Sequence, residues 1–261
     1  MIYTRGVGKA AAASTAEVLT WTETDNGINT VDNPVFRWHF AMTGTARDYD
    51  ALNAIIAKKG GSQFWRANEL QHAALIQRLT KKTGPGATAT RFTVPFDLGS
   101  WDPGIIVGAP LNVGLRAELD VDNTPSATGV VTIFHGRMPG IAPTHYPKYL
   151  SSAAGVAASS TSARYPVTQN GILRGICLPR TTSITDIRLY INNQVVWDLS
   201  GPGLLEAQEL EEGGTVSLNR FLVTDPWPIV PGATFVELTV DGSWAATDEV
   251  AFYSLVPQNE A

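Results

Sequence analysis

Hydrophobic residues along this chain come in short β-branched or aromatic segments, which Gly, Pro, Asn and Asp separate at regular intervals. Such a pattern is typical of an all-β sandwich or barrel. It predicts about eight strands in each half of the chain. In the first half they lie near 17–22, 34–41, 52–57, 62–66, 90–97, 104–108, 114–121 and 129–135. In the second half they lie near 163–168, 171–178, 185–191, 194–198, 215–223, 228–230, 234–240 and 248–255.

A helical periodicity interrupts the strands of the first half. It predicts a helix that begins after the capping residue Asn68 and stops at Lys82, before Gly84 and Pro85. The apolar face of this helix consists of Leu70, Ala74, Leu75 and Leu79. A shorter helix is predicted at 203–212, in the equivalent place of the second half.

Two segments of the chain read as copies of one hairpin. Residues 52–66 are LNAIIAKKGGSQFWR and residues 184–198 are ITDIRLYINNQVVWD, an offset of 132 that aligns Trp65 with Trp197. Each segment is a strand, a polar two-residue turn and a second strand that contains the tryptophan. This order of elements is the signature of a β-hairpin. The sequence therefore predicts two equivalent hairpins, with both tryptophans in the core.

Further matches extend the duplication in the same order along the chain. Their offsets never increase from the N-terminus onward, as loop deletions in one copy would produce. The pairs are Asn33 and Arg37 with Asn170 and Arg174 (offset 137), 91–94 with 220–223 (offset 129), and 118–122 with 237–241 and 127–134 with 246–253 (both offset 119).

The length of 261 residues fits two domains. A stretch rich in Pro, Ala and Ser around 137–167 marks the boundary between them. The predicted organisation is an N-terminal segment at 1–16, a first domain at 17–136, a linker at 137–162 and a second domain at 163–261. The alternative is one large sandwich that carries a long surface loop.

Charge and composition narrow the function classes. The net charge of −5, with acidic and basic residues mixed along the chain, argues against a basic nucleic-acid-binding surface. The single cysteine, Cys177, excludes an intramolecular disulfide framework and fits a buried side chain in a protein made in a reducing cytoplasm. The segment 1–14 lacks the leucine-rich core of a signal peptide, and no apolar run suits a membrane-spanning helix.

The residues that usually carry chemistry show no active-site pattern, so neither catalytic nor cofactor-binding nor metal-binding residues are predicted. The four histidines lack metal-site spacing, and we expect His72 on the helix surface and His135 solvated or hydrogen-bonded at a strand end. Asp120, Asp122 and Asn123 fit a turn better than a calcium loop. Four carboxylates are candidates for a glycosidase pair: Asp97, Asp102, Glu118 and Glu237. Of these, Glu118 and Glu237 alternate with apolar residues and should face solvent or pair across a sheet.

The repeat layout resembles the double jelly-roll major capsid proteins of tailless icosahedral bacteriophages, in their compact, corticovirus-like or tectivirus-like form. The likeness rests on the two strand-turn-strand-Trp units at 52–66 and 184–198, each followed by a predicted helix, and on the segment 91–97 leading into the strand at 115–122. It extends from about Val18 to Val256. It implies two tandem eight-stranded antiparallel sandwiches with a short helix in each.

The resemblance also implies a function and partners. Chains of this family form trimers with a pseudo-six-fold outline, which assemble into an icosahedral shell in the host cytoplasm. Vertex or minor capsid proteins are further partners, and an internal membrane would lie beneath the N-terminal segment, where a short helix and a disordered tail both remain open. Apolar anchors for the contacts between copies would be the loop aromatics Trp101, Trp227, Trp244, Tyr146 and Tyr149.

A carbohydrate-active protein built from two jelly rolls is the alternative function. A peptide N-glycosidase-like enzyme or a sugar-binding adhesin would also use aromatic loops. Such secreted proteins usually carry an export signal or disulfides, so their absence from this sequence favours the structural protein.

Overall fold

The computed structural model describes residues 1–12, 15–26, 28–43, 52–80, 91–97, 104–121, 129–153, 162–179, 184–200, 219–240 and 249–260. The chain divides into two compact units. Unit 1 contains Met1–Glu69, Pro85–Tyr149 and Leu255–Ala261, and unit 2 contains Leu70–Gly84 and Leu150–Ser254.

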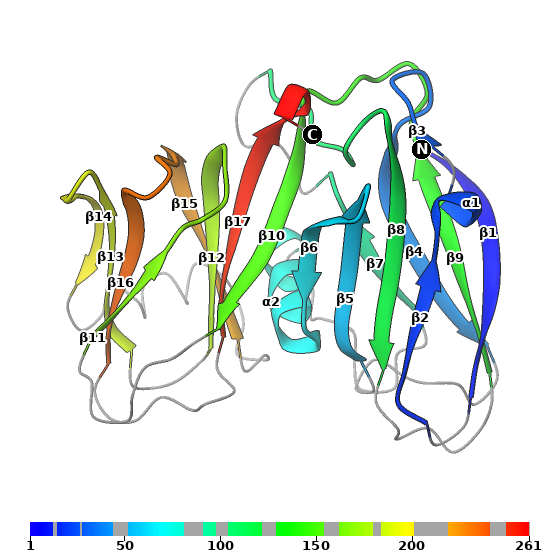
Figure 1. Ribbon diagram of the computed structural model, residues 1–261. Helices are drawn as coiled ribbons and strands as arrows, with labels where there is room; N and C mark the ends of the chain where they lie inside the picture. Colours follow the sequence, from blue (N-terminus) through cyan, green and yellow to red (C-terminus); the bar gives the residue numbers. More distant parts are fainter. Residues whose placement is uncertain are drawn as a thin grey trace. The chain divides into compact units, whose positions relative to one another are not determined.

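Unit 1 contains one four-stranded antiparallel sheet and four antiparallel strands of a larger sheet (Figure 1). The first sheet has the order β1 (Ile2–Ala11), β9 (Gly129–Arg137), β4 (Val35–Thr43) and β7 (Arg91–Pro95). The second sheet has the order β2 (Glu17–Trp21), β8 (Val113–Val121), β5 (Leu52–Lys59) and β6 (Ser62–Ala67). Shorter elements are α1 (Glu23–Asn26), β3 (Ile28–Asn29), which pairs with β8, and the 3-10 turn η2 (Gln258–Glu260).

Unit 2 repeats this plan. One strand order is β10 (His145–Ala153), β17 (Glu249–Pro257), β12 (Ile172–Pro179) and β15 (Asn219–Pro228). The other is β11 (Ser162–Pro166), β16 (Thr234–Val240), β13 (Ile184–Ile191) and β14 (Gln194–Ser200). Both β10 and β17 begin in one unit and end in the other. Within unit 1, β10 pairs in parallel with β6, where Tyr149 lies beside Trp65.

The order of the strands in these sheets is that of a jelly roll. If β1, β2, β4, β5, β6, β7, β8 and β9 are numbered one to eight, the two sheets read 1-8-3-6 and 2-7-4-5. The eight strands β10 to β17 give the same two orders. The predicted fold class, two tandem eight-stranded antiparallel jelly rolls, is therefore confirmed.

Register in the two strand sets agrees residue by residue with the offsets read from the sequence. Trp38 lies opposite Val94. The residues equivalent to them, Gly175 at an offset of 137 and Val223 at an offset of 129, also lie opposite each other. Ile55 lies opposite Leu119, just as Ile187 lies opposite Leu238.

The duplicated hairpin is repeated down to its irregularity. In β5–β6 the register shifts between Ala57 and Lys58, and in β13–β14 it shifts between Leu189 and Tyr190, which are the equivalent residues. Both predicted two-residue turns have positive φ, at 49° and 93° for Gly60 and Gly61 and at 51° and 62° for Asn192 and Asn193.

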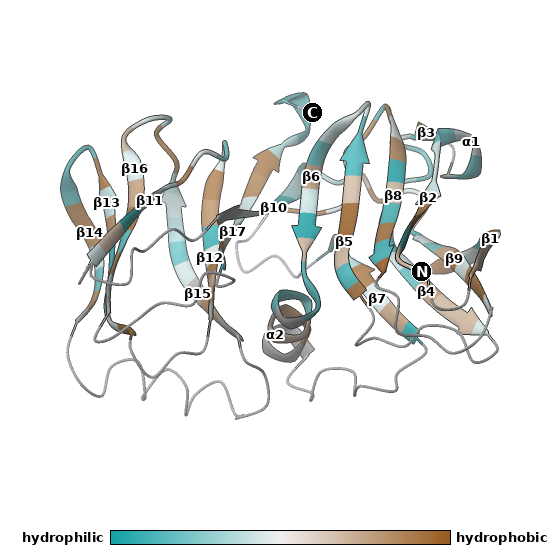
Figure 2. Ribbon diagram, turned by 60° about the horizontal axis from the view of Figure 1, so that its bottom comes forward, coloured by the Kyte–Doolittle hydropathy of each residue, from teal (hydrophilic) through white to brown (hydrophobic). Residues whose placement is uncertain are grey.

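The cores of the two units differ in composition. Unit 1 packs aromatic side chains edge to face, and Trp38, Phe96 and Trp65 form a connected group with ring centroids 4.9 and 6.0 Å apart. Unit 2 has a mainly aliphatic core, formed by Leu173, Ile176, Ile187, Leu189, Val236, Leu238 and their neighbours. Figure 2 shows brown, apolar stretches within the strands of both units. Trp65 is fully buried as predicted, whereas Trp197 is only partly buried against the core of unit 2.

The predicted helix is confirmed as α2 (Glu69–Thr80), which begins directly after Asn68. Its predicted end at Lys82 and the second helix at 203–212 lie outside the described residues. Two predicted strands are not separate strands in the structure. The segment 104–108 makes only a single bridge, from Val107 to His145, and 228–230 overlaps β15, which ends at Pro228.

Strands occupy two segments that lie outside both domains of the predicted organisation. The expectation of a helix or disordered tail at the N-terminus is wrong, because residues 2–11 form β1 and pair with β9. Much of the predicted linker at 137–162 is β10, with His145–Ala153 in a sheet. We propose limits for the two jelly rolls that include these strands, from Ile2 to Arg137 and from His145 to Pro257.

Candidate functional surfaces

Exposed apolar side chains concentrate on strands at the ends of sheets. β1 exposes Ile2, Tyr3 and Val7, with 60%, 53% and 43% of their surface accessible, and β14 exposes Val195 at 47%. A strand at the end of a sheet also presents backbone donors and acceptors along its outer edge. Among the described strands, β1, β14 and also β2, which exposes Val18 at 54%, combine the two features from which strand-to-strand contacts are made.

β1 is held tightly to the rest of unit 1 in spite of its exposed side chains. The indole Nε1 of Trp21 donates a hydrogen bond to the carbonyl oxygen of Val7 at 2.7 Å, where β1 bulges between Arg5 and Gly8. A Cβ atom on Gly6 would lie only 2.7 Å from a methyl carbon of Ile133, so the bulge requires glycine there. β1 is thus a fixed edge with a defined register.

The aromatic anchors predicted for contacts between copies lie elsewhere than expected. Tyr146 and Tyr149 are buried in unit 1, at 3% and 0% exposure, because they belong to β10 and not to a loop. Trp227 is only partly buried and packs against the core of unit 2. Trp101 and Trp244 lie outside the described residues. The aromatic residues alone do not reveal from sequence which of them are buried and which are partly exposed.

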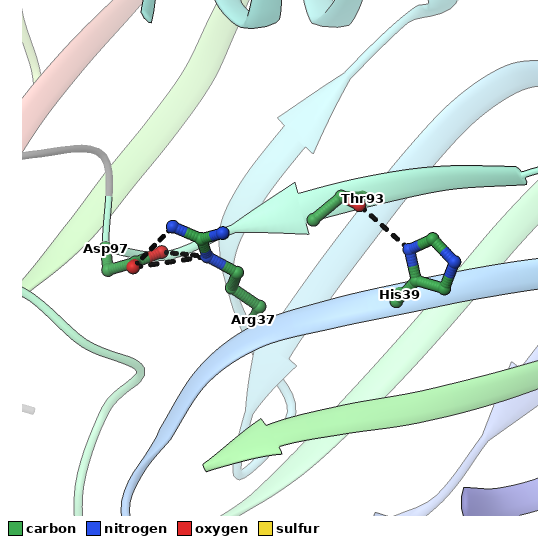
Figure 3. Close-up of polar contacts among 4 residues, drawn as sticks. All are labelled: Arg37, His39, Thr93 and Asp97. Carbon is green, nitrogen blue, oxygen red and sulfur yellow. Dashed lines mark hydrogen bonds and ion pairs between the residues drawn. The ribbon is translucent and has the colours of Figure 1, made fainter. Parts of the chain in front are cut away.

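The histidines do not form a site. His72 is fully buried, which corrects its placement on the helix surface, because the buried face of α2 also includes Gln71, Ala74 and Leu75. His39 is half-buried on β4 and its Nδ1 lies 2.9 Å from the hydroxyl of Thr93 on β7 (Figure 3). Burial lowers the pKa of His39, and the positive charge of Arg91 lowers it further.

His135 is buried on β9, so of the two expected outcomes, a solvated or a hydrogen-bonded side chain, the solvated one is wrong. Burial lowers its pKa to about 4, and the charge of Arg137 contributes to the shift. The neutral form is therefore the one that the folded chain accommodates.

This burial predicts an acid-dependent loss of stability. An unfolded histidine titrates near its ordinary pKa of 6.5, so the contribution of neutral His135 is fully present above that pH. It falls as the pH drops toward 4, by about 3 kcal/mol in total. Urea unfolding at pH 7 and pH 4 should show a smaller loss in His135→Asn than in the wild type. An equal loss in both proteins would contradict this role, and His145→Asn, at a more exposed position, is the matched control.

The candidate carboxylates are engaged in ion pairs. Asp97 accepts hydrogen bonds from Arg37 at 2.9 Å (Figure 3), and burial raises the pKa of its carboxyl group while Arg37 opposes that shift. Glu118 lies within 2.8 Å of Lys58 and 2.7 Å of Arg116. Asp102 and Asp122 lie outside the described residues. A carboxylate held by a cation is poorly suited to donate a proton, so this arrangement favours structure over glycoside hydrolysis.

Glu237 belongs to a row of alternating charges on the outer face of the β11-β16-β13-β14 sheet. Arg164 pairs with Glu237 on β16, which lies opposite Arg188, and Arg188 pairs with Asp198 at 3.2 Å. The predicted cross-sheet pairing of Glu118 and Glu237 is thus confirmed. Pairs in water stabilise a fold by about 0–1 kcal/mol, so their main effect is to fix the charge pattern of this face.

Neither a metal cluster nor a membrane helix appears in the described part of the chain. No group of three or more His, Cys, Asp or Glu side chains there could hold a metal ion. No described helix is long and apolar enough to cross a membrane.

Comparisons with known proteins place this topology among viral capsids. No protein-family model matches the chain, and no curated protein matches it either. The major capsid protein P2 of bacteriophage PM2 is similar in structure, with a TM-score of 0.68 and 8% identity over 96% of this chain and 98% of that chain. The PBCV-1 virus capsid gives a TM-score of 0.54 and 9% identity over 98% of this chain and 92% of that chain.

The carbohydrate-active alternative gains no support from these comparisons. PNGase F, a glycosylasparaginase from Flavobacterium meningosepticum, gives a TM-score of only 0.39, with 10% identity. The strand orders and the two similar structures agree with each other. This chain has the double jelly-roll fold of viral major capsid proteins.

Proposed function

We propose that this chain is the major capsid protein of a tailless icosahedral bacteriophage and that its role is structural. The observation that carries the proposal is the match of both jelly rolls, over 96% of this chain and 98% of the chain of the PM2 protein. A shell protein needs edges and faces that bind further copies. The apolar edge strands β1 and β14 meet this need, and the ion-paired carboxylates fit a protein without catalysis.

The proposed assembly unit is a homotrimer. Three chains supply six jelly rolls, which gives a pseudo-six-fold block that tiles an icosahedral shell. Vertex or minor capsid proteins, assembly in the host cytoplasm and an internal membrane belong to the same proposal. Because residues 2–11 are a strand in a sheet, a membrane contact near the N-terminus would not use a helix made from them.

Light scattering coupled to size exclusion tests the trimer. The expected mass is three times 28.0 kDa, independent of dilution over the range measured. Electron microscopy of the concentrated protein should then show closed shells or shell fragments. A monomer at every concentration would refute the proposed function.

A further inference from the structure

β1 and β14 each lie at the end of a sheet, and the strands equivalent to them in the other jelly roll pair with each other. β1 ends its sheet in unit 1, and β14 ends its sheet in unit 2. In the duplicated plan, β10 occupies the position of β1, and β6 occupies the position of β14. β10 and β6 pair in parallel, with Tyr149 beside Trp65. The contact between β10 and β6 therefore has a possible equivalent between β1 and β14. Among the described strands, however, β1 and β14 do not pair with each other.

The equivalence of β6 and β14 is established residue by residue. Both follow a two-residue turn with positive φ, and both carry the same register shift against the preceding strand. The offset of 132 places Trp197 at the position of Trp65. Trp65 is fully buried, whereas Trp197 is only partly buried, as expected for a residue whose second neighbour is missing.

The equivalence of β1 and β10 rests on register and sequence. Ile2-Tyr3-Thr4-Arg5 matches His145-Tyr146-Pro147-Lys148 at an offset of 143. The following strands, β2 and β11, support this value. Leu19 lies opposite Leu119, and Ala163 lies opposite Leu238, the equivalent of Leu119. Leu19 and Ala163 are therefore equivalent at an offset of 144. Tyr146 is 3% exposed and its counterpart Tyr3 is 53% exposed.

We infer that β14 of one copy pairs in parallel with β1 of the next copy, in the register that β6 and β10 show within the chain. This inference rests on the proposed function and names the surface that its trimer would use. Gly6 is equivalent to Tyr149 at the offset of 143, and Trp197 is equivalent to Trp65 at the offset of 132. Because Tyr149 lies beside Trp65, Gly6 of one copy would lie beside Trp197 of the other. The next residues along both strands, Val7 and Asp198, then lie side by side.

Charge and polarity agree with this register. β1 carries a positive charge at Arg5, next to the bulge that contains Gly6 and Val7, and β14 carries a negative charge at Asp198. The exposed side chains of Val7 and Val195 would gain apolar neighbours. Because the two edges differ, the contact is head-to-tail, and repeated rotation closes it into a ring.

Disulfide cross-linking between copies tests the register. Cα atoms of neighbouring strands lie about 5 Å apart, within the range that a disulfide spans. The variant Val7→Cys with Asp198→Cys should give covalent oligomers up to the closed ring on non-reducing gels after mild oxidation. The matched control is Val7→Cys with Val195→Cys, whose partners would lie about 10 Å apart along the strand and should stay monomeric on the gel.

Background reactions are small because Cys177 is buried. Both variants should melt like the wild type under reducing conditions, since all three positions are exposed. A non-covalent trimer without cross-linking of the 7/198 pair would overturn this inference and leave the proposed function intact. Equal cross-linking of the control, or a disulfide within one chain, would overturn it as well. A wild-type monomer in light scattering would instead refute the proposed trimer.

Discussion

Trp65→Ala should lower the free energy of unfolding by about 3–5 kcal/mol, the usual loss for truncating a buried tryptophan. Its ring is fully buried and lies 5.1 Å from that of Tyr149 and 6.0 Å from that of Phe96. Truncation would leave a cavity where β6 and β10 meet within unit 1. Urea unfolding monitored by circular dichroism measures the loss.

Two matched variants separate packing from other effects. Trp65→Phe should cost much less than alanine, because the indole Nε1 has no hydrogen-bond partner in the structure to lose. Trp197→Ala should cost about 1–2 kcal/mol, because this equivalent ring is only partly buried. Equal losses at 65 and 197 would mean that the two positions are equally packed, contrary to the structure.

Asn29→Ala should destabilise the chain by about 3–5 kcal/mol because the backbone amide of Val35 and the carbonyl oxygen of Pro110 lose their hydrogen bonds, whereas that of Ala109 keeps one from Gln258. The Asn29 side chain donates to the carbonyl oxygens of Ala109 and Pro110 at 3.1 and 2.8 Å. Its Oδ1 accepts a hydrogen bond from the backbone amide of Val35. Thermal melting and urea unfolding measure the effect.

Asn29→Asp is the sharper version of the same experiment. A carboxylate keeps the acceptor for Val35 but cannot donate to two carbonyl oxygens, so it should be as damaging as alanine at neutral pH. Asn53→Ala is the control, since Asn53 is exposed and contacts Asp120 only at 3.5 Å. If Asn29→Ala unfolded like this control, the buried contacts of Asn29 would contribute little to stability.

Much of the fold was predictable because the duplication supplies information that single strands lack. The aligned hairpins predicted two polar turns, and both are present, with positive φ at Gly60 and Asn192. The offsets predicted which strands are equivalent, and the register of β4–β7 and β12–β15 agrees with them. In a duplicated chain, each strand can be predicted from two copies of its sequence pattern, so its position is predicted more accurately.

The first strand of each jelly roll escaped prediction for a physical reason. β1 contains Gly6 and Gly8 and ends in alanines, and β10 runs into a stretch of Ser and Ala. Small residues give little alternation of apolar and polar side chains, which is the signal for a half-buried strand. Extending the series of offsets to 143 would have found both strands, because Tyr3 and Tyr146 match.

Side-chain placement was predicted less well than strand position. His72 looked like a surface residue, since histidine is often solvated, and it is buried. Tyr146 and Tyr149 looked like loop anchors because their strand was missed. Whether an aromatic or histidine side chain faces the core depends on neighbours from distant parts of the chain, which local patterns do not specify.

The pairing of β1 with β9 affects how the chain folds during synthesis. Ile2 lies opposite Arg137, so 135 residues separate two partners in one sheet. At about 5–20 residues per second, the ribosome needs on the order of ten seconds to deliver β9 after β1 has emerged. The two hairpins of sequential strands can form within microseconds of synthesis, whereas β1 must wait. In a nascent chain stalled before Gly129, the backbone of β1 should therefore lack the hydrogen-bond partners that β9 supplies.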